Sequence, residues 1–135
     1  MYKFVFNDKE YELKEENCEC FINDEENPVN GFELSDAMEL LNGAKNINFD
    51  LEYFGEPCEN CYEGKKEKTY KYLEYHFYIF SKEGTYVTSS ISSEYENTSF
   101  NKLLKAEKVD NSYIVSIIVC ENCGEFSIEI EECGV

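Results

Sequence analysis

The cysteines of this 135-residue chain are its best candidates for chemistry, because there are seven of them and several are closely spaced. The same tetrapeptide, Cys-Glu-Asn-Cys, occurs at residues 58–61 and again at residues 120–123. Two residues between the thiolates let both sulfurs converge on one ion. Gly124 follows the second motif and permits the tight turn that such a pair requires. Together, the two motifs supply the four thiolates that tetrahedral Zn²⁺ accepts.

Each motif lies between two segments whose alternating apolar residues predict strands. The flanking segments are residues 47–53 and 69–80 for the first motif, and 113–119 and 126–130 for the second. Two hairpin-like turns that each present a thiolate pair resemble a zinc ribbon, and the chain resembles short bacterial proteins of uncharacterised families that carry such zinc knuckles. The resemblance implies one set of ligands for a structural Zn²⁺: Cys58, Cys61, Cys120 and Cys123.

The two knuckles, residues 58–61 and 120–124, are far apart along the chain. Residues 62–119 separate the two cysteine pairs, whereas roughly 15–20 residues are usual for this pattern. A long insertion costs little closure entropy, so one ion could still join distant parts of a single sheet. If all four thiolates bind the ion, no coordination position remains for water, which argues against a catalytic zinc.

Other interpretations of the paired cysteines remain open. Disulfides are disfavoured, because nothing in the sequence signals export and the cytosol keeps thiols reduced. A thioredoxin-like redox pair should open a helix after a strand, and two copies would be surplus. An iron–sulfur or rubredoxin-like iron site shares the four-cysteine geometry, so the spacing does not distinguish iron from zinc.

The remaining cysteines and the single histidine admit a second site. Cys18 and Cys20 would point to the same side of an extended segment, and Cys133 and His76 could complete a second cluster with them. The alternative is that these cysteines are small buried hydrophobic residues. His76 lies among tyrosines in a strand-like segment, which is typical of a packed or hydrogen-bonded sheet residue.

Four of the twelve lysines follow the first motif closely, at positions 65, 66, 68 and 71. Cationic neighbours favour thiolate over thiol, so these lysines could offset the negative charge of a four-thiolate zinc centre. They could also dock an acidic partner or a small anion. The segment contains Glu63 and Glu67 as well, so an ordinary solvated loop is the competing interpretation.

The N-terminal third predicts a hairpin, a loop and a helix. Apolar residues occupy alternate positions over residues 2–6 and 11–13, on either side of a turn at Asn7-Asp8, which indicates a β-hairpin. Residues 15–31 are acidic and loop-like. Ser35 has the side chain of a helix N-cap, and Gly43 is placed to end the helix that follows.

The rest of the chain predicts an antiparallel sheet. Along residues 69–80 one face holds Leu73, Tyr75, Phe77 and Ile79, and a turn at 81–84 leads into a strand that ends near Ile91. Thr98 could cap a second short helix, although residues 102–109 could instead form a strand. The sum is one acidic α+β domain over residues 1–135, mainly antiparallel sheet with two short helices and a zinc-ribbon-like pair of knuckles.

Charge limits the classes of partner. The formal net charge is -17 and the sequence pI is about 4.3, while 16% of the residues are aromatic. Such a chain should fold, and its surface should repel nucleic acids and anionic membranes. The chain has no arginine, which removes bidentate recognition of phosphate. No targeting segment is visible, so a cytoplasmic location is expected.

Known catalytic motifs are missing from the sequence. It contains no P-loop, no Gly-x-Gly-x-x-Gly and no His-Glu-x-x-His. We therefore expect a small acidic binding or adaptor module with a structural Zn(Cys)₄ site and a basic protein as its partner. The alternatives are an acidic mimic of nucleic acid that occupies a basic protein's binding site, and an enzyme whose site the sequence does not disclose.

Overall fold

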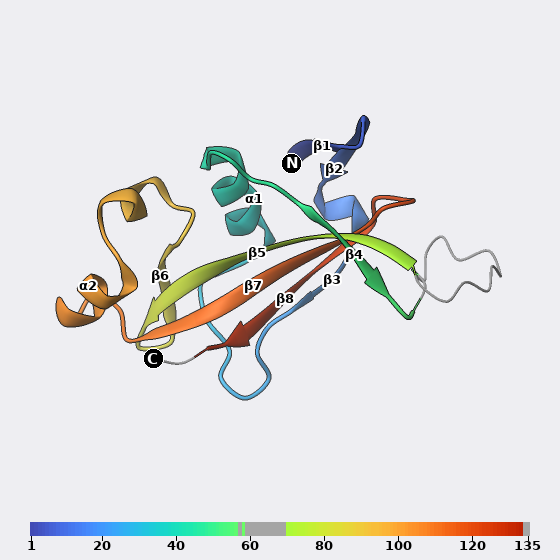
Figure 1. Cartoon of the computed structure of the whole chain (residues 1–135). Coiled ribbons are helices and arrows are strands. Elements are labelled where there is room, and N and C mark those ends of the chain that lie inside the picture. Colours follow the sequence, from blue (N-terminus) through green and yellow to red (C-terminus); the bar gives the residue numbers. More distant parts are fainter. Residues whose placement is uncertain (57, 59–69, 134–135) are drawn as a thin grey trace.

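The computed structural model describes residues 1–56, 58 and 70–133. It is an α+β fold made mainly of antiparallel sheet with two short helices, as the sequence predicts (Figure 1). The elements follow in the order β1 Tyr2–Phe6, β2 Lys9–Leu13, η1 Glu15–Asn17, β3 Cys18–Ile22, α1 Leu34–Gly43, β4 Asp50–Phe54, β5 Tyr70–Lys82, β6 Thr85–Ser89, η2 Ser93–Asn97, α2 Phe100–Lys105, β7 Asn111–Cys120 and β8 Phe126–Glu132.

A six-stranded sheet forms the centre of the molecule. Its strand order is β3-β8-β7-β5-β4, and β6 pairs with β5. The longest ladder joins β5 to β7 in antiparallel register, from Tyr72 opposite Cys120 to Ser81 opposite Asn111. Residues directly opposite one another in such a ladder point to the same face of the sheet. This register therefore decides which side chains of distant segments meet.

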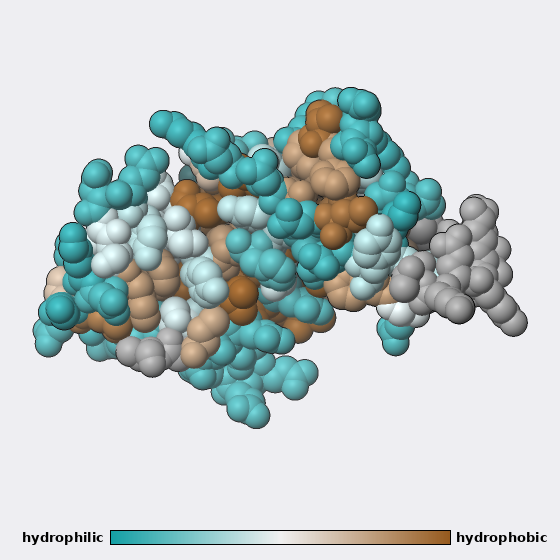
Figure 2. Space-filling view, viewed as in Figure 1, coloured by the Kyte–Doolittle hydropathy of each residue, from teal (hydrophilic) through white to brown (hydrophobic). Residues whose placement is uncertain are grey.

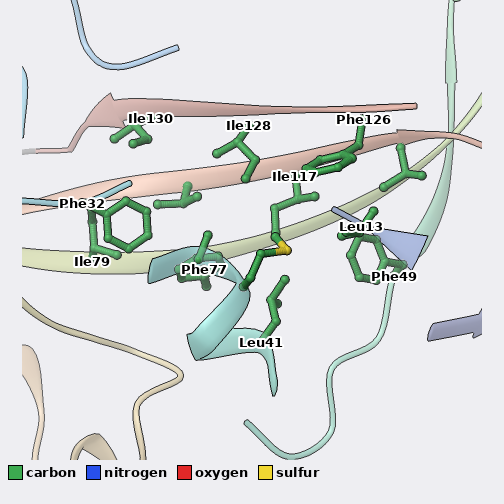
Figure 3. Packing of buried hydrophobic residues seen from close by; sticks show 14 of the residues in the cluster. Leu13, Phe32, Leu41, Phe49, Phe77, Ile79, Ile117, Phe126, Ile128 and Ile130 are labelled. Atoms are coloured by element: carbon green, nitrogen blue, oxygen red, sulfur yellow. The ribbon is translucent and has the colours of Figure 1, made fainter. Parts of the chain in front are cut away.

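One face of the sheet, here called the covered face, carries the hydrophobic core. Alternate residues of its central strands are fully buried there: Leu73, Phe77, Ile79, Val115, Ile117, Val119, Phe126, Ile128 and Ile130. Helix α1 covers them with Ala37, Met38 and Leu41, which lie on one helical stripe. Figure 3 shows Leu41 pointing toward Phe77 and Ile117 of the sheet.

The β1–β2 hairpin lies on the same face as α1 (Figure 1). Asn7 and Asp8 at its turn both have positive φ, 50° and 63°, as a two-residue turn of type I′ requires. Phe4 stacks on Phe49 with 4.1 Å between the ring centroids, and Leu13 is fully buried. In Figure 2, hydrophilic residues cover most of the visible surface, and a hydrophobic patch remains over this hairpin.

The opposite face, here called the open face, is covered at one end. Phe80 stacks on Tyr95 of η2 and on Phe100 of α2, with centroid distances of 5.3 and 5.0 Å. Figure 1 shows η2 and α2 together at the β6 end of the sheet. Within the described residues, no helix is long and apolar enough to cross a membrane.

The structure corrects the prediction of a loop over residues 15–31. Residues Glu15–Asn17 form a 3₁₀ turn, and Cys18–Ile22 form β3, which pairs in parallel with β8. The segment is short and edge-located, and its partner strand begins more than one hundred residues later. Local periodicity therefore gave no sign of the pairing.

Several element boundaries also differ from the predictions. Glu33, rather than Ser35, is the N-cap of α1, where it forms a capping box with Asp36. Gly43 is the last residue of α1, whereas the sequence predicted it as the residue just after the helix. Ser99, rather than Thr98, caps α2, and its hydroxyl accepts a hydrogen bond from the Lys102 backbone N–H. Serine, threonine and carboxylate side chains can all accept such bonds, so neighbouring candidates compete.

Three predicted strands, β4, β5 and β6, have different ends in the structure. The segment predicted over residues 47–53 becomes a strand only at Asp50, although Phe49 before it is buried in the core. Strand β5 continues to Lys82, and the turn to β6 consists of Glu83 and Gly84, both with positive φ. Strand β6 ends at Ser89, before Ile91.

Candidate metal centre

Three cysteine sulfurs converge where the β7–β8 turn meets the segment after β4. The Sγ atoms of Cys58, Cys120 and Cys123 all lie within 4.8 Å of one another. Those of Cys58 and Cys123 are 3.7 Å apart. Cys120 and Cys58 are largely shielded from water, with 5% and 9% of their surface exposed, whereas Cys123 is exposed. This cluster could hold a metal ion.

The distances fit a thiolate-bound metal. Tetrahedral Zn²⁺ with Zn–S bonds of about 2.3 Å places its sulfurs about 3.8 Å apart. The Cys58–Cys123 separation of 3.7 Å matches that edge. A disulfide requires sulfurs about 2.05 Å apart, and these three cysteines are not disulfide-bonded. The arrangement is therefore one that could hold a common ion.

Strand β7 and a tight turn position Cys120 and Cys123. Cys120 ends β7, and its backbone N–H donates to the carbonyl of Glu125 at 2.8 Å. The Gly124 N–H donates to the Cys120 carbonyl at 3.0 Å, which closes the turn. Gly124 has φ of +82°, a conformation that side chains with a Cβ adopt at a cost. The role predicted for this glycine is confirmed.

Side chains from the N-terminal hairpin hold the carbonyl groups of this turn. Lys9 Nζ donates to the Glu121 and Asn122 carbonyls at 3.0 and 2.7 Å. The Tyr11 hydroxyl donates to the Glu121 carbonyl at 2.7 Å, and Asn17 Nδ2 donates to the Gly124 carbonyl at 3.0 Å. Sequence reasoning missed all three residues, because each lies more than one hundred positions from the turn.

Burial raises the pKa values of groups around the cluster. The pKa of the Cys123 thiol lies well above its usual value, first because of desolvation and then because of the neighbouring Cys58 and Cys120 thiols. Burial, together with the nearby charges of Glu121 and Cys120, raises the pKa of Tyr11 to about 12. Several thiols this close do not ionise together unless a cation offsets their charge.

The segment that carries Cys58 has different support. It follows β4, and the Tyr72 hydroxyl donates to the Glu56 carbonyl at 3.1 Å. Tyr72 also packs edge-to-face against Phe54, with 5.1 Å between the centroids. Tyr72 lies opposite Cys120 in the β5–β7 register, so the open face brings the two cysteine-bearing segments together.

Residues 2–135 match the model of a family described as a protein of unknown function (DUF3785). The chain belongs to this family. No curated protein and no solved structure matches it.

In this DUF3785 chain, Cys61 and three of the four candidate lysines lie outside the described residues. These lysines are Lys65, Lys66 and Lys68. Lys71 is described, and its backbone carbonyl accepts a hydrogen bond from the Glu121 N–H at 3.3 Å. Among the described residues, the ammonium group of Lys9 reaches the Cys120–Cys123 turn. A prediction based on neighbours in sequence did not find it.

The second cluster considered from sequence is not assembled in the DUF3785 chain. Cys20 pairs with Ser127 of β8, whereas Cys133 follows the far end of that strand. Six residues of strand place them about 20 Å apart. Among the described residues, the cysteines at 58, 120 and 123 form the one group of potential ligands that converges.

His76 is a hydrogen-bonded sheet residue, as its context predicts. Its Nδ1 lies 2.8 Å from Ser116 Oγ, and its Nε2 lies 3.5 Å from Glu74 Oε2. Sequence reasoning did not foresee this Glu-His-Ser row, which depends on the register of β5 and β7. A serine nucleophile in such a row would also need nearby backbone N–H groups to stabilise an oxyanion. The N–H groups of β7 instead pair with β5 on one side and with β8 on the other.

Proposed function

We propose that the protein holds one structural Zn²⁺ through Cys58, Cys61, Cys120 and Cys123, and serves as a binding module for a basic protein. The convergence of the three described sulfurs carries the metal part of this proposal. Cys61 supplies the fourth ligand, because it stands in the same Cys-Glu-Asn-Cys spacing to Cys58 as Cys123 does to Cys120. Two such knuckles make a zinc-ribbon-like centre.

The proposed role of the ion is structural. Four thiolates complete the coordination of Zn²⁺ and leave no open position for a substrate or water. The ion would join the segment after β4 to the β7–β8 turn, two parts of one sheet that are distant in sequence. Thiolate ligands require a reducing environment, which agrees with the expected cytoplasmic location.

Metal analysis of the purified full chain tests this proposal. We expect about one zinc per chain, and loss of the metal in Cys58→Ser and Cys123→Ser. Cys133→Ser is the matched control, because Cys133 is exposed and lies at the far end of β8. It should retain zinc fully. A wild-type protein that is prepared without chelator and contains no metal would overturn the proposal.

The binding part of the proposal rests on charge. A surface with a net charge of -17 attracts basic proteins over long range and repels polyanions. The chain contains no arginine, so its own contacts to a partner would come from carboxylates, tyrosines and lysines. Steep weakening of any partner complex by salt is the expected signature.

A further inference from the structure

The open face of the sheet carries a row of carboxylates on its central and edge strands. In the observed register Glu52 lies opposite Tyr72, Glu74 opposite Ile118, and Glu129 opposite Ser116. Asp50 and Glu131 occupy equivalent positions on β4 and β8. Because η2 and α2 pack at the Phe80 end, this acidic region lies between them and the cysteine cluster.

A groove of about 440 Å³ lies on this face, and Cys58 and Cys120 of the cysteine cluster are among its lining residues. Tyr72 and Ile118 contribute apolar surface, and Phe54 meets Tyr72 edge-to-face. Glu56 and Glu129 are among the carboxylates that line it, and no lysine is among its described lining residues. Its volume is within the range of about 300–1,000 Å³ that is usual for ligand sites.

Two lysines of the described region, Lys3 and Lys14, neutralise carboxylates elsewhere. The lysine–carboxylate ion pairs found there join Lys3 and Lys14 to Glu10 and Glu12, on the hairpin that lies against the covered face. On the open face, Glu74 contacts His76, a pair that is ionic only when the histidine is protonated. The carboxylates of Glu52, Glu129 and Glu131 thus leave this face strongly negative.

We propose that this groove docks a lysine- or arginine-rich segment of a partner protein. The inference rests on the proposed function, because it locates the surface that would receive the basic partner. Long cationic side chains can lay their apolar stems on Tyr72 and Ile118 while their charged ends reach the glutamates. The Phe54 and Tyr72 rings add cation–π contacts, which bind ammonium and guanidinium groups. An acidic segment, a nucleic acid or an anionic membrane would be repelled.

Binding of a synthetic peptide tests this surface directly. The probe is an octapeptide of alternating lysine and serine, and its counterpart carries glutamate in place of lysine. The full-length variant E56Q/E125Q/E129Q, here called the open-face variant, removes three charges from the lining of the groove. The matched control, E15Q/E16Q/E39Q, removes three exposed charges from η1 and α1. Both variants change the net charge equally, so long-range attraction alone would affect them equally.

We expect the open-face variant to bind the lysine peptide at least about tenfold more weakly, and the control less than about twofold more weakly. Backbone amide shifts caused by the peptide should map to β4, β5 and β7. The glutamate peptide should not bind. Equal weakening of the two variants would overturn the proposal, and so would amide shifts confined to other surfaces.

The aromatic part of the groove has its own pair of variants. Phe54→Leu removes the ring that packs against Tyr72, and should weaken binding of the lysine peptide about threefold. Tyr53→Leu is the control, because Tyr53 is an exposed neighbour that points to the other face of β4. Equal effects of the two substitutions would contradict the aromatic contact.

Zinc content measured on the same samples separates this inference from the proposed function. Peptide binding at the open face without bound zinc would sustain the docking surface and overturn the metal centre. Bound zinc together with peptide binding at another surface would support the metal centre and overturn the docking surface.

Discussion

The two halves of the cysteine cluster are supported in different ways. The Cys120–Gly124 turn is held by its own backbone bonds and by four side-chain hydrogen bonds from Lys9, Tyr11 and Asn17. Among the described residues, the segment that presents Cys58 receives an exposed hydrogen bond from Tyr72 and makes a contact between the Cys58 and Cys123 sulfurs. Within the part of the chain that the structure describes, the first half therefore has more hydrogen-bond support than the second.

This difference indicates what a metal ion would contribute. Hydrogen bonds that fix the turn carbonyls hold Cys120 and Cys123 near their ligand positions before an ion arrives. Binding energy would then be available to hold the Cys58 segment in place, so we expect metal binding to be coupled to the local folding of β4 and the start of β5. The predictions below test this asymmetry.

Removal of the metal should have the largest effect. A strong chelator should lower the melting temperature by more than about 10 °C, because binding of a structural zinc stabilises the fold. Hydrogen exchange should show greater loss of protection in β4 than in the Cys120–Gly124 turn. A melting curve that does not change after verified removal would show that the centre has no structural role. Equal loss in both regions would contradict the asymmetry.

Asn17→Ala should have the next largest effect, because Asn17 joins three backbone groups. Its Nδ2 donates to the carbonyls of Glu12 and Gly124, and its Oδ1 accepts from the Lys14 N–H. The loss should cost about 1–3 kcal/mol in the free energy of unfolding. Asn48→Ala is the control, since Asn48 is exposed and its side chain makes one long contact of 3.4 Å. Denaturant unfolding that is equal for the two variants would contradict the anchoring role.

Tyr11→Phe should have a smaller effect at neutral pH and a distinct effect in alkali. Loss of the bond to Glu121 should cost about 1 kcal/mol. Since the pKa of Tyr11 is about 12 in the fold and near 10 when unfolded, the neutral phenol favours folding. Stability should therefore be full below pH 10 and decline toward pH 12.

The alkaline decline should be shallower in Tyr11→Phe than in the wild type. Some decline should remain, because burial also raises the pKa values of Tyr2, Tyr75, Tyr86 and Tyr113. Urea unfolding at a series of pH values measures this difference. Identical slopes for the two proteins would show that Tyr11 ionises as freely in the fold as outside it.

A substitution beside the Cys58 segment should have the smallest effect on the free energy of unfolding. Tyr72→Phe keeps the ring against Phe54 and removes the exposed hydrogen bond to the Glu56 carbonyl. We expect a loss of about 0.5 kcal/mol or less. A loss larger than that of Tyr11→Phe would reverse the proposed asymmetry.

Local patterns in the sequence predicted much of this fold. The alternation of Leu73, Phe77 and Ile79 identified the covered face of β5, and the Cys-Glu-Asn-Cys repeat identified both sides of the cluster. These features depend on neighbouring residues, whose spacing follows the period of a strand or the reach of a turn. The hairpin at Asn7-Asp8 was predictable for the same reason.

Contacts between distant segments could not be predicted in this way. The pairing of β3 with β8, the row formed by His76 and Ser116, and the bond from Asn17 to Gly124 all join residues far apart in sequence. Each depends on sheet register, which tertiary packing decides. Polar residues such as Lys9 and Asn17 also carry no hydrophobic pattern that would mark them as anchors.

X-ray absorption at the zinc edge of the purified wild-type protein tests the central claim most directly. The proposed centre predicts one zinc per chain, surrounded by four sulfur atoms at about 2.3 Å. Because Cys58, Cys120 and Cys123 supply at most three sulfurs, a fourth sulfur that is lost in Cys61→Ser would assign Cys61 to the centre. A shell that contains nitrogen or oxygen, or a protein that carries iron or no metal, would contradict the closed Zn(Cys)₄ centre.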